Sequence, residues 1–156
     1  MTRLTLHRDV GFPRRHVYDI VADVRRYPEF LPGFQGVRVK GEQNGKLMVY
    51  QSLGFKGLRR AFHTYASFDP PEVIRITTNE APFRHLDQVW RFDSLGERMT
   101  RVTLDAEYEF ADRLAKGFAE RIFPHLMRQS MDAFVRRAAR VTPSRSNAPA
   151  QQQKDP

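Results

Sequence analysis

The sequence contains no cysteine, which excludes disulfide bonds, thiolate metal sites and thiol nucleophiles. It also lacks any run of about 18 apolar residues, the length that a membrane-spanning helix requires. The first residues do not contain the apolar stretch of a secretory signal. We therefore expect a soluble, cytoplasmic protein, with peripheral contact to the inner face of the membrane as a further option.

Motifs of common enzyme classes are missing too. There is no P-loop, no glycine-rich dinucleotide fingerprint and no His-Glu-x-x-His zinc motif. The five histidines are scattered, and only His63 and His85 could meet across a sheet, which favours polar sheet positions over a metal site. Asp105, Glu107 and Glu109 alternate on one strand and should face solvent. The sequence thus predicts a non-enzymatic protein that requires no cofactor.

Hydrophobic residues and basic charge are abundant. Hydrophobic residues make up 40% of the chain, twelve phenylalanines among them, which suffices for the core of one domain. Lys and Arg number 26 against 18 Asp and Glu, so the net charge is 26 − 18 = +8. Such a charge favours anionic partners, either nucleic acid or an acidic membrane surface.

Alternating polar and apolar residues predict an antiparallel sheet of consecutive hairpins. Gln43-Asn44-Gly45 is a tight-turn signal, because Asn and Gly tolerate positive φ. Val102, Leu104, Ala106, Tyr108 and Phe110 would form the covered face of the last strand. The expected strands are 2–8, 35–42, 46–54, 58–68, 72–79, 86–94 and 100–110.

Helical spacing of apolar residues predicts a helix over 14–24 and a long helix over 112–140. Pro124 should interrupt and kink the long helix. Between the first helix and the sheet, Tyr27–Gly33 places two prolines around Phe30 and Leu31, which indicates a short helical turn. We expect a domain over 1–141 and a disordered tail over 142–156.

This order of elements predicts an α+β fold in which a curved antiparallel sheet of about seven strands grips the long C-terminal helix. A single helix covers little of a wide concave face. The space between them is therefore expected to form a cavity for an apolar ligand.

Several segments together resemble one family over about residues 4–141. They are Val21–Val24 with Tyr27–Gly33, Pro82–Leu86 with Trp90–Phe92, Glu107–Phe110, and Phe134–Ala138. In these residues the chain is similar to the START-like helix-grip superfamily. Within it, the chain resembles the coenzyme Q-binding (Coq10-type) proteins and the ribosome-association toxins, often labelled polyketide cyclase/dehydrase.

The resemblance implies that the protein binds a hydrophobic ligand, a prenylated quinone such as ubiquinone or a related lipid, in support of respiration or quinone handling. Two alternatives stay open: binding to the large ribosomal subunit through ribosomal RNA, and a polyketide cyclase or aromatase activity. The expected ligand-binding residues are Tyr27, Phe30, Leu31, Phe34, Phe62, Phe83, Trp90, Phe118, Ile122, Leu126 and Met127.

Two surfaces allow two interpretations each. Tyr27–Gly33 is either a proline-rich corner packed on the helix or a lid whose Phe30 and Leu31 close the cavity mouth. The basic face of the long helix is either solvated or in contact with anionic headgroups or ribosomal RNA. Its basic residues are Arg113, Lys116, Arg121, Arg128, Arg136, Arg137 and Arg140.

Overall fold

The computed structural model describes residues 1–55 and 57–142, without the side chains of 55, 58 and 113–119. The elements are β1 (Thr2–Val10), α1 (Arg14–Ala22), a 3-10 turn (Val24–Arg26), α2 (Tyr27–Phe30), β2 (Phe34–Gln43), β3 (Lys46–Phe55), β4 (Leu58–Asp69), β5 (Val73–Thr78), β6 (Phe83–Gly96), β7 (Met99–Phe110) and α3 (Arg113–Arg140). All predicted strands and helices are present within a few residues. Apart from Thr142, the predicted tail lies outside the described residues.

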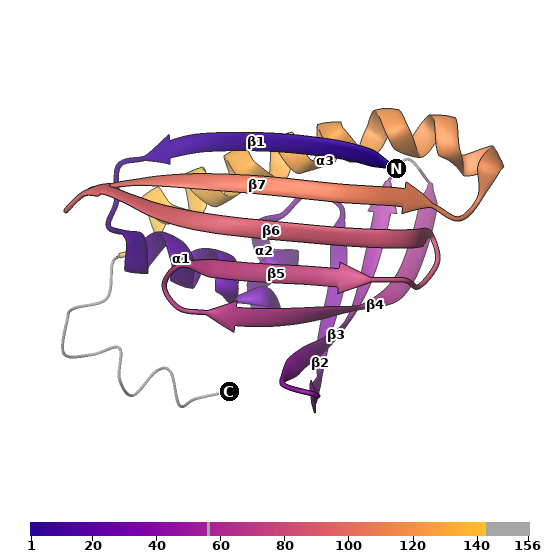
Figure 1. The fold of residues 1–156 in the computed structure, drawn as a ribbon, viewed down its shortest axis with the longest axis horizontal. Coiled ribbons are helices and arrows are strands. Elements are labelled where there is room, and N and C mark those ends of the chain that lie inside the picture. Colours follow the sequence, from indigo (N-terminus) through magenta and orange to yellow (C-terminus); the bar gives the residue numbers. More distant parts are fainter. Residues whose placement is uncertain (56, 143–156) are drawn as a thin grey trace.

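The strands form one antiparallel sheet in the order β1-β7-β6-β5-β4-β3-β2 (Figure 1). The strands from β2 to β7 are connected in chain order by consecutive hairpins. β1 pairs with β7 and forms the edge of the sheet opposite β2. The turn between β2 and β3 is as predicted, because Asn44 and Gly45 both have positive φ. The α+β helix-grip architecture is thereby confirmed.

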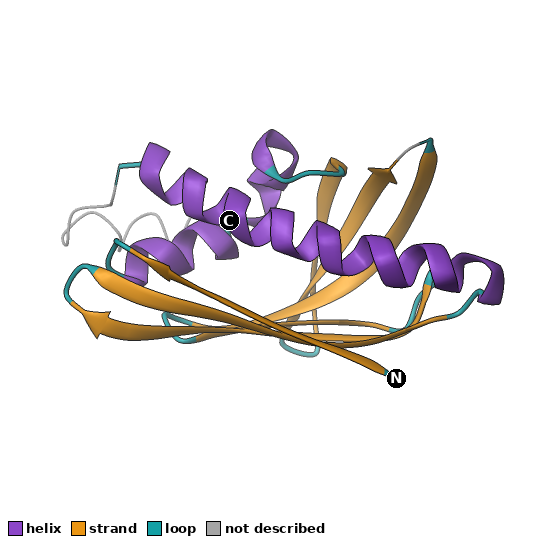
Figure 2. Ribbon diagram, turned by 90° about the horizontal axis from the view of Figure 1, so that it is seen from above, coloured by secondary structure: helices purple, strands orange, loops and turns teal. Residues whose placement is uncertain are grey.

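The sheet curves around α3, which crosses its concave face (Figure 2). Four of the five residues of the predicted covered face of β7 are buried, with Leu104 fully buried, whereas Phe110 is half-buried and Thr100 is buried as well. Met131 and Ala138 of α3 are equally inaccessible and belong to the same hydrophobic core. The helix continues through Pro124 from Arg113 to Arg140, so the expected interruption does not occur.

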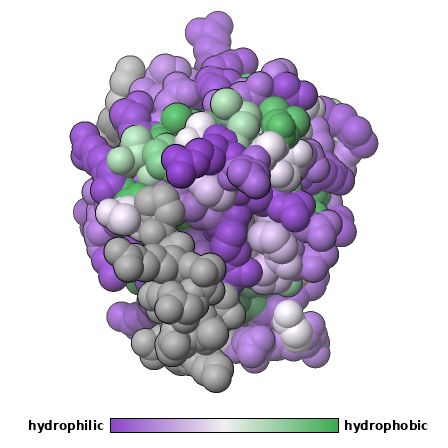
Figure 3. Space-filling view, turned by 90° about the vertical axis from the view of Figure 1, so that its left-hand side faces the viewer, coloured by the Kyte–Doolittle hydropathy of each residue, from purple (hydrophilic) through white to green (hydrophobic). Residues whose placement is uncertain are grey.

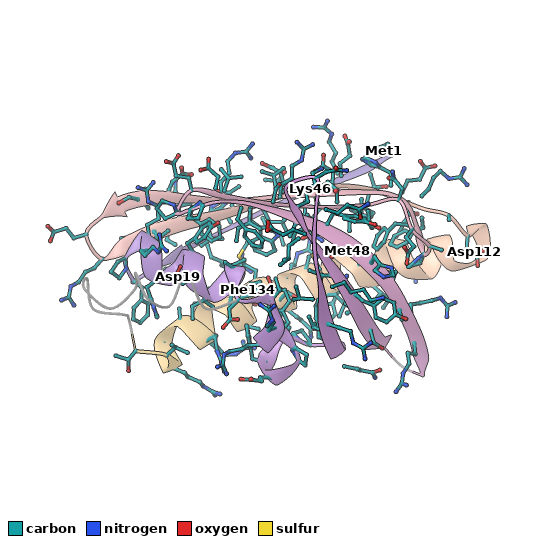
Figure 4. All side chains as sticks on the ribbon, turned by 90° about the horizontal axis from the view of Figure 1, so that it is seen from below. Met1, Asp19, Lys46, Met48, Asp112 and Phe134 are labelled. Carbon is teal, nitrogen blue, oxygen red and sulfur yellow. The ribbon has the colours of Figure 1, made fainter. Side chains whose placement is uncertain are left out.

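Ion pairs cover the opposite face of the sheet, where charged side chains point away from α3 (Figure 4). Arg91 pairs with Asp105 at 2.9 Å and Arg3 with Glu107 at 2.9 Å. Glu109 lies 3.9 Å from Arg84. The three carboxylates of β7 are therefore on the solvent side, as expected.

The side chain of Tyr27 connects α2 with α1, β2 and α3. Its hydroxyl donates a hydrogen bond to the Val21 carbonyl, and its ring makes edge contacts with Phe34 at 5.3 Å and Phe134 at 5.6 Å. Burial is the main cause that raises the pKa of Tyr27 above its ordinary value, and the nearby Asp23 carboxylate adds to it. The phenol is consequently neutral throughout the physiological pH range.

A second contact joins α2 to α3 at the surface. The Phe30 ring lies 5.7 Å from that of Phe134, and the Arg137 guanidinium lies 4.8 Å above Phe30. Arg137 also donates a hydrogen bond to Glu29 at 3.1 Å. Arg137 is therefore largely engaged with α2 and is not the free surface charge that the sequence suggested.

At about pH 7 we expect Tyr27→Phe to lower the free energy of unfolding by about 1 kcal/mol, because the Val21 carbonyl loses its donor. The pKa of Tyr27 is higher in the folded protein than in the unfolded chain, where it is about 10. Above about pH 10 the unfolded chain therefore loses the Tyr27 proton first, and the stability that Tyr27 contributes to the folded protein is lost as the pH rises further. The difference between wild type and variant should thus shrink at about pH 11. Urea unfolding at both pH values measures it, and a difference that grows with pH would contradict the role of Tyr27.

Candidate functional site

A cavity of about 230 Å³ lies between the concave face of the sheet, α2 and α3. Most of its wall is apolar. Strands β2 to β7, the segment that follows α2, and α3 all contribute side chains. The cavity therefore occupies the space that one helix leaves unfilled across the curved sheet.

Two aromatic clusters contribute to this wall. The first joins Tyr27, Phe34, Trp90 and Phe134, and Trp90 contacts Phe134 edge-on at 5.4 Å. Phe134 lies inside the molecule, among α2, α3 and the sheet (Figure 4). The second cluster comprises Phe62, Phe83, Phe110 and Phe123. Rings from both clusters can contact a flat, apolar ligand between them.

Nine of the eleven expected ligand-binding residues line this cavity. They are Tyr27, Leu31, Phe34, Phe62, Phe83, Trp90, Ile122, Leu126 and Met127. Phe30 is not part of the wall, because its ring packs on Phe134 and under Arg137 at the surface. The side chain of Phe118 lies outside the described residues. That the nine residues bind a ligand remains a prediction.

The segment after α2 is packed as a corner, the first of the two interpretations, and the lid remains a prediction. Leu31 is 6% exposed and lines the cavity. Gly33 has a φ of 84°, and its carbonyl accepts a hydrogen bond from the Gly54 N–H at 2.8 Å. A Cβ at Gly33 would lie only 3.3 Å from the Gly54 carbonyl oxygen, so a larger residue would disturb this contact. The segment is a packed corner that also walls the cavity.

Polar side chains on the inner face are the main feature that the sequence interpretation missed. Gln51, Thr64, Gln88 and Ser130 line the cavity. Strand parity could have identified three of them. For example, Gln88 stands two residues from both Leu86 and Trp90, which are buried on the concave face.

The spacing along α3 could have identified the helix residues of the wall. Phe123, Met127, Ser130 and Phe134 follow one another at intervals of four, three and four residues, which places them on one face. The ligand-binding residues expected from the sequence included Met127 but omitted Phe123, Ser130 and Phe134.

The charged groups lie away from the cavity interior. Exposed Arg60 is the one charged side chain among the described wall residues. His63 instead contacts Glu80 at 3.2 Å, and His85 lies 3.4 Å from Glu107. Within the part of the chain that the structure describes, no group of three His, Asp or Glu residues is arranged to hold a metal ion.

Two relatives extend over most of this chain. The ribosome association toxin RatA of Pseudomonas aeruginosa is 32% identical over 130 residues, which cover 83% of this chain and 90% of the toxin. The coenzyme Q-binding protein COQ10 homolog B of Xenopus laevis is 30% identical over 136 residues. They cover 85% of this chain and 56% of that protein.

The fold is also similar to that of the Zhui aromatase/cyclase from Streptomyces sp. R1128. The TM-score is 0.81 at 19% identity, with 89% of this chain and 94% of the enzyme covered. A family model described as polyketide cyclase / dehydrase and lipid transport matches residues 10–135. The chain belongs to this polyketide cyclase/dehydrase and lipid transport family.

Proposed function

We propose that the protein binds a prenylated quinone of the ubiquinone type in the cavity and acts as a binding protein in quinone handling. The observation that carries the proposal is the apolar cavity between the sheet and α3, with aromatic rings from two clusters in its wall. A quinone ring is flat and apolar on its faces, so such rings can contact it on several sides. The similarity to a protein named for coenzyme Q binding supports the same ligand class.

The volume of the cavity limits how much of the ligand it holds. Pockets for whole drug-sized ligands measure about 300–1,000 Å³, whereas this cavity measures about 230 Å³. A substituted ring with the first part of its tail is the portion that fits. The remainder of a long isoprenoid tail would leave beside Arg60, the one exposed residue among the described wall residues.

The wall chemistry supports binding without catalysis. Among the described wall residues there is no His, Asp, Glu or Lys, the side chains that most often transfer protons. The Tyr27 hydroxyl donates to Val21, and its raised pKa keeps it neutral. The similarity to an aromatase/cyclase lies in the fold alone.

Ribosome association is the second candidate, and it is favoured by the 90% coverage of the RatA toxin. The ion pairs of the sheet occupy many arginines, but α3 presents the exposed Arg121, Arg128, Arg136 and Arg140. No described carboxylate forms an ion pair with these four. They are the residues on α3 that we propose would contact ribosomal RNA or an anionic membrane surface.

Among the described helices, α3 included, none combines the length and apolarity that crossing a bilayer requires. The end of the molecule that carries the β6–β7 turn is mainly hydrophilic with small apolar patches (Figure 3). Leu95 and Met99 of that turn are exposed, at 48% and 39%.

Native mass spectrometry of gently purified protein should show one bound ligand per chain, and solvent extraction should recover a quinone or isoprenoid. Ribosome co-sedimentation is measured on the same preparation. An empty protein that co-sediments with ribosomal subunits would contradict quinone binding and support the second candidate.

Leu31→Asp should abolish retention of this ligand, because a carboxylate in the wall must either be hydrated or be buried at a cost of several kcal/mol. Leu95→Asp introduces the same change at an exposed position and should retain the ligand. Extraction and mass spectrometry measure both variants, with thermal melting to verify the fold.

Leu126→Asp, at a half-buried wall position, replaces the first variant if Leu31→Asp does not fold. A folded wall variant that still carries stoichiometric quinone would show that the ligand does not occupy this cavity. Ligand loss from Leu95→Asp as well would make the effect non-specific.

A further inference from the structure

The indole of Trp90 fixes the orientation of a neighbouring amide in the cavity wall. Its Nε1 donates a hydrogen bond to Gln88 Oε1 at 2.9 Å. An indole N–H can only donate, so the amide oxygen of Gln88 must face Trp90. The amide NH₂ of Gln88 is the group left to bind a ligand, since Gln88 lines the cavity.

A second amide of the wall accepts a hydrogen bond on a different strand. The Thr64 hydroxyl donates to Gln51 Oε1 at 3.1 Å, and both residues are buried wall residues of β4 and β3. The NH₂ of Gln51 has no hydrogen-bond partner among the described residues. Ser130 adds a hydroxyl that can rotate to donate or accept. The polar part of the cavity thus presents one amide NH₂ whose direction the Trp90 N–H fixes and a second amide NH₂ on Gln51, and the described wall residues include no carboxylate.

The two amides stand on β3 and β6, which β4 and β5 separate in the sheet. The sheet curves around α3 (Figure 2), and both glutamines line the cavity, so the two donors belong to different parts of the wall. A ligand with acceptor atoms on more than one edge therefore matches this wall better than a ligand with a single polar end.

We propose that Gln88 and Gln51 donate hydrogen bonds to ring oxygens of the ligand, so that the cavity selects the oxidised quinone over its hydroquinone. This inference rests on the quinone-binding function proposed above. The carbonyl and methoxy oxygens of the quinone only accept hydrogen bonds, whereas each hydroxyl of the hydroquinone must also donate one. The Gln88 oxygen is committed to the Trp90 N–H, and the Gln51 oxygen accepts from the Thr64 hydroxyl, so in this arrangement a hydroquinone hydroxyl at either amide would face an NH₂ group.

In this arrangement Gln88 determines specificity and Trp90 is a positioning residue. Trp90 is 3% exposed and also contacts Phe134, which restrains the indole. Its N–H keeps the Gln88 amide from rotating and presenting its oxygen to the ligand. The preference for an oxidised ring is therefore a property of the Gln88–Trp90 pair.

Decyl-substituted dimethoxybenzoquinone and its hydroquinone, titrated under anaerobic conditions, test the inference directly. Trp90 is the only tryptophan of the chain and lines the cavity, so quenching of its fluorescence reports binding. For the wild type we expect the quinone to bind about tenfold more tightly, the effect of leaving a buried donor unsatisfied. Gln88→Met should reduce this ratio severalfold, mainly through weaker quinone binding.

Gln129→Met is the matched control, because Gln129 is exposed on α3 and the same change should leave the ratio intact. Equal affinities of the wild type for both forms would overturn the selectivity while leaving quinone binding in place. Failure of both forms to bind would overturn the proposed function and this inference together. Because Gln88→Met leaves the Trp90 N–H unpaired, the thermal melting of this variant is measured as well. If the variant does not fold, the ratio of quinone to hydroquinone affinity of the wild type alone decides the selectivity.

Discussion

The packing of one helix across a wide, curved sheet is the constraint from which the other features follow. Met131 and Ala138 of α3 are fully buried in the core, whereas Phe123 and Met127 line the cavity. Close packing at one end and a cavity toward the other are thus two results of the same geometry. His16 of α1 reinforces the packed end through a 2.9 Å contact with the Ala138 carbonyl. The cavity can consequently stay open without loss of the core.

Contacts between α2 and α3 close the cavity on the side that the sheet does not cover. Inside the molecule, the rings of Tyr27 and Phe134 pack against each other. At the surface, Arg137 donates a hydrogen bond to Glu29 and lies above the ring of Phe30. Two separate kinds of contact therefore hold the corner formed by α2. Entry of a ligand would require a local movement of this corner or passage beside Arg60. The wall itself combines apolar rings with oriented amide donors, a composition suited to a ring that carries oxygen atoms at its edges.

Local patterns in the sequence were sufficient for most of the fold. The alternation in β7 identified its covered face, and Asn44-Gly45 identified the β2–β3 turn, because side-chain parity and backbone φ depend on neighbouring residues alone. Pairing of β1 with β7 depends on residues about a hundred positions apart and could not be read from either strand. For the same reason the sequence did not reveal that Arg137 would meet Glu29, or that Phe30 would turn away from the cavity. The alternation of inward and outward side chains along each strand could have predicted that the two glutamines face the cavity. Their polarity alone suggested a solvent-exposed position.

Methyl NMR of the methionines tests the central claim, that the ligand occupies the cavity between the sheet and α3. The chain has five methionines, and Met127 is the one among the described wall residues. Met1 and Met99 are exposed, at 70% and 39%. On titration with decyl-substituted dimethoxybenzoquinone, the Met127 methyl signal should shift and saturate at one ligand per chain, while those of Met1 and Met99 remain in place. A saturable shift at Met99 or Met1 with an unchanged Met127 would place the ligand outside the cavity and contradict the account.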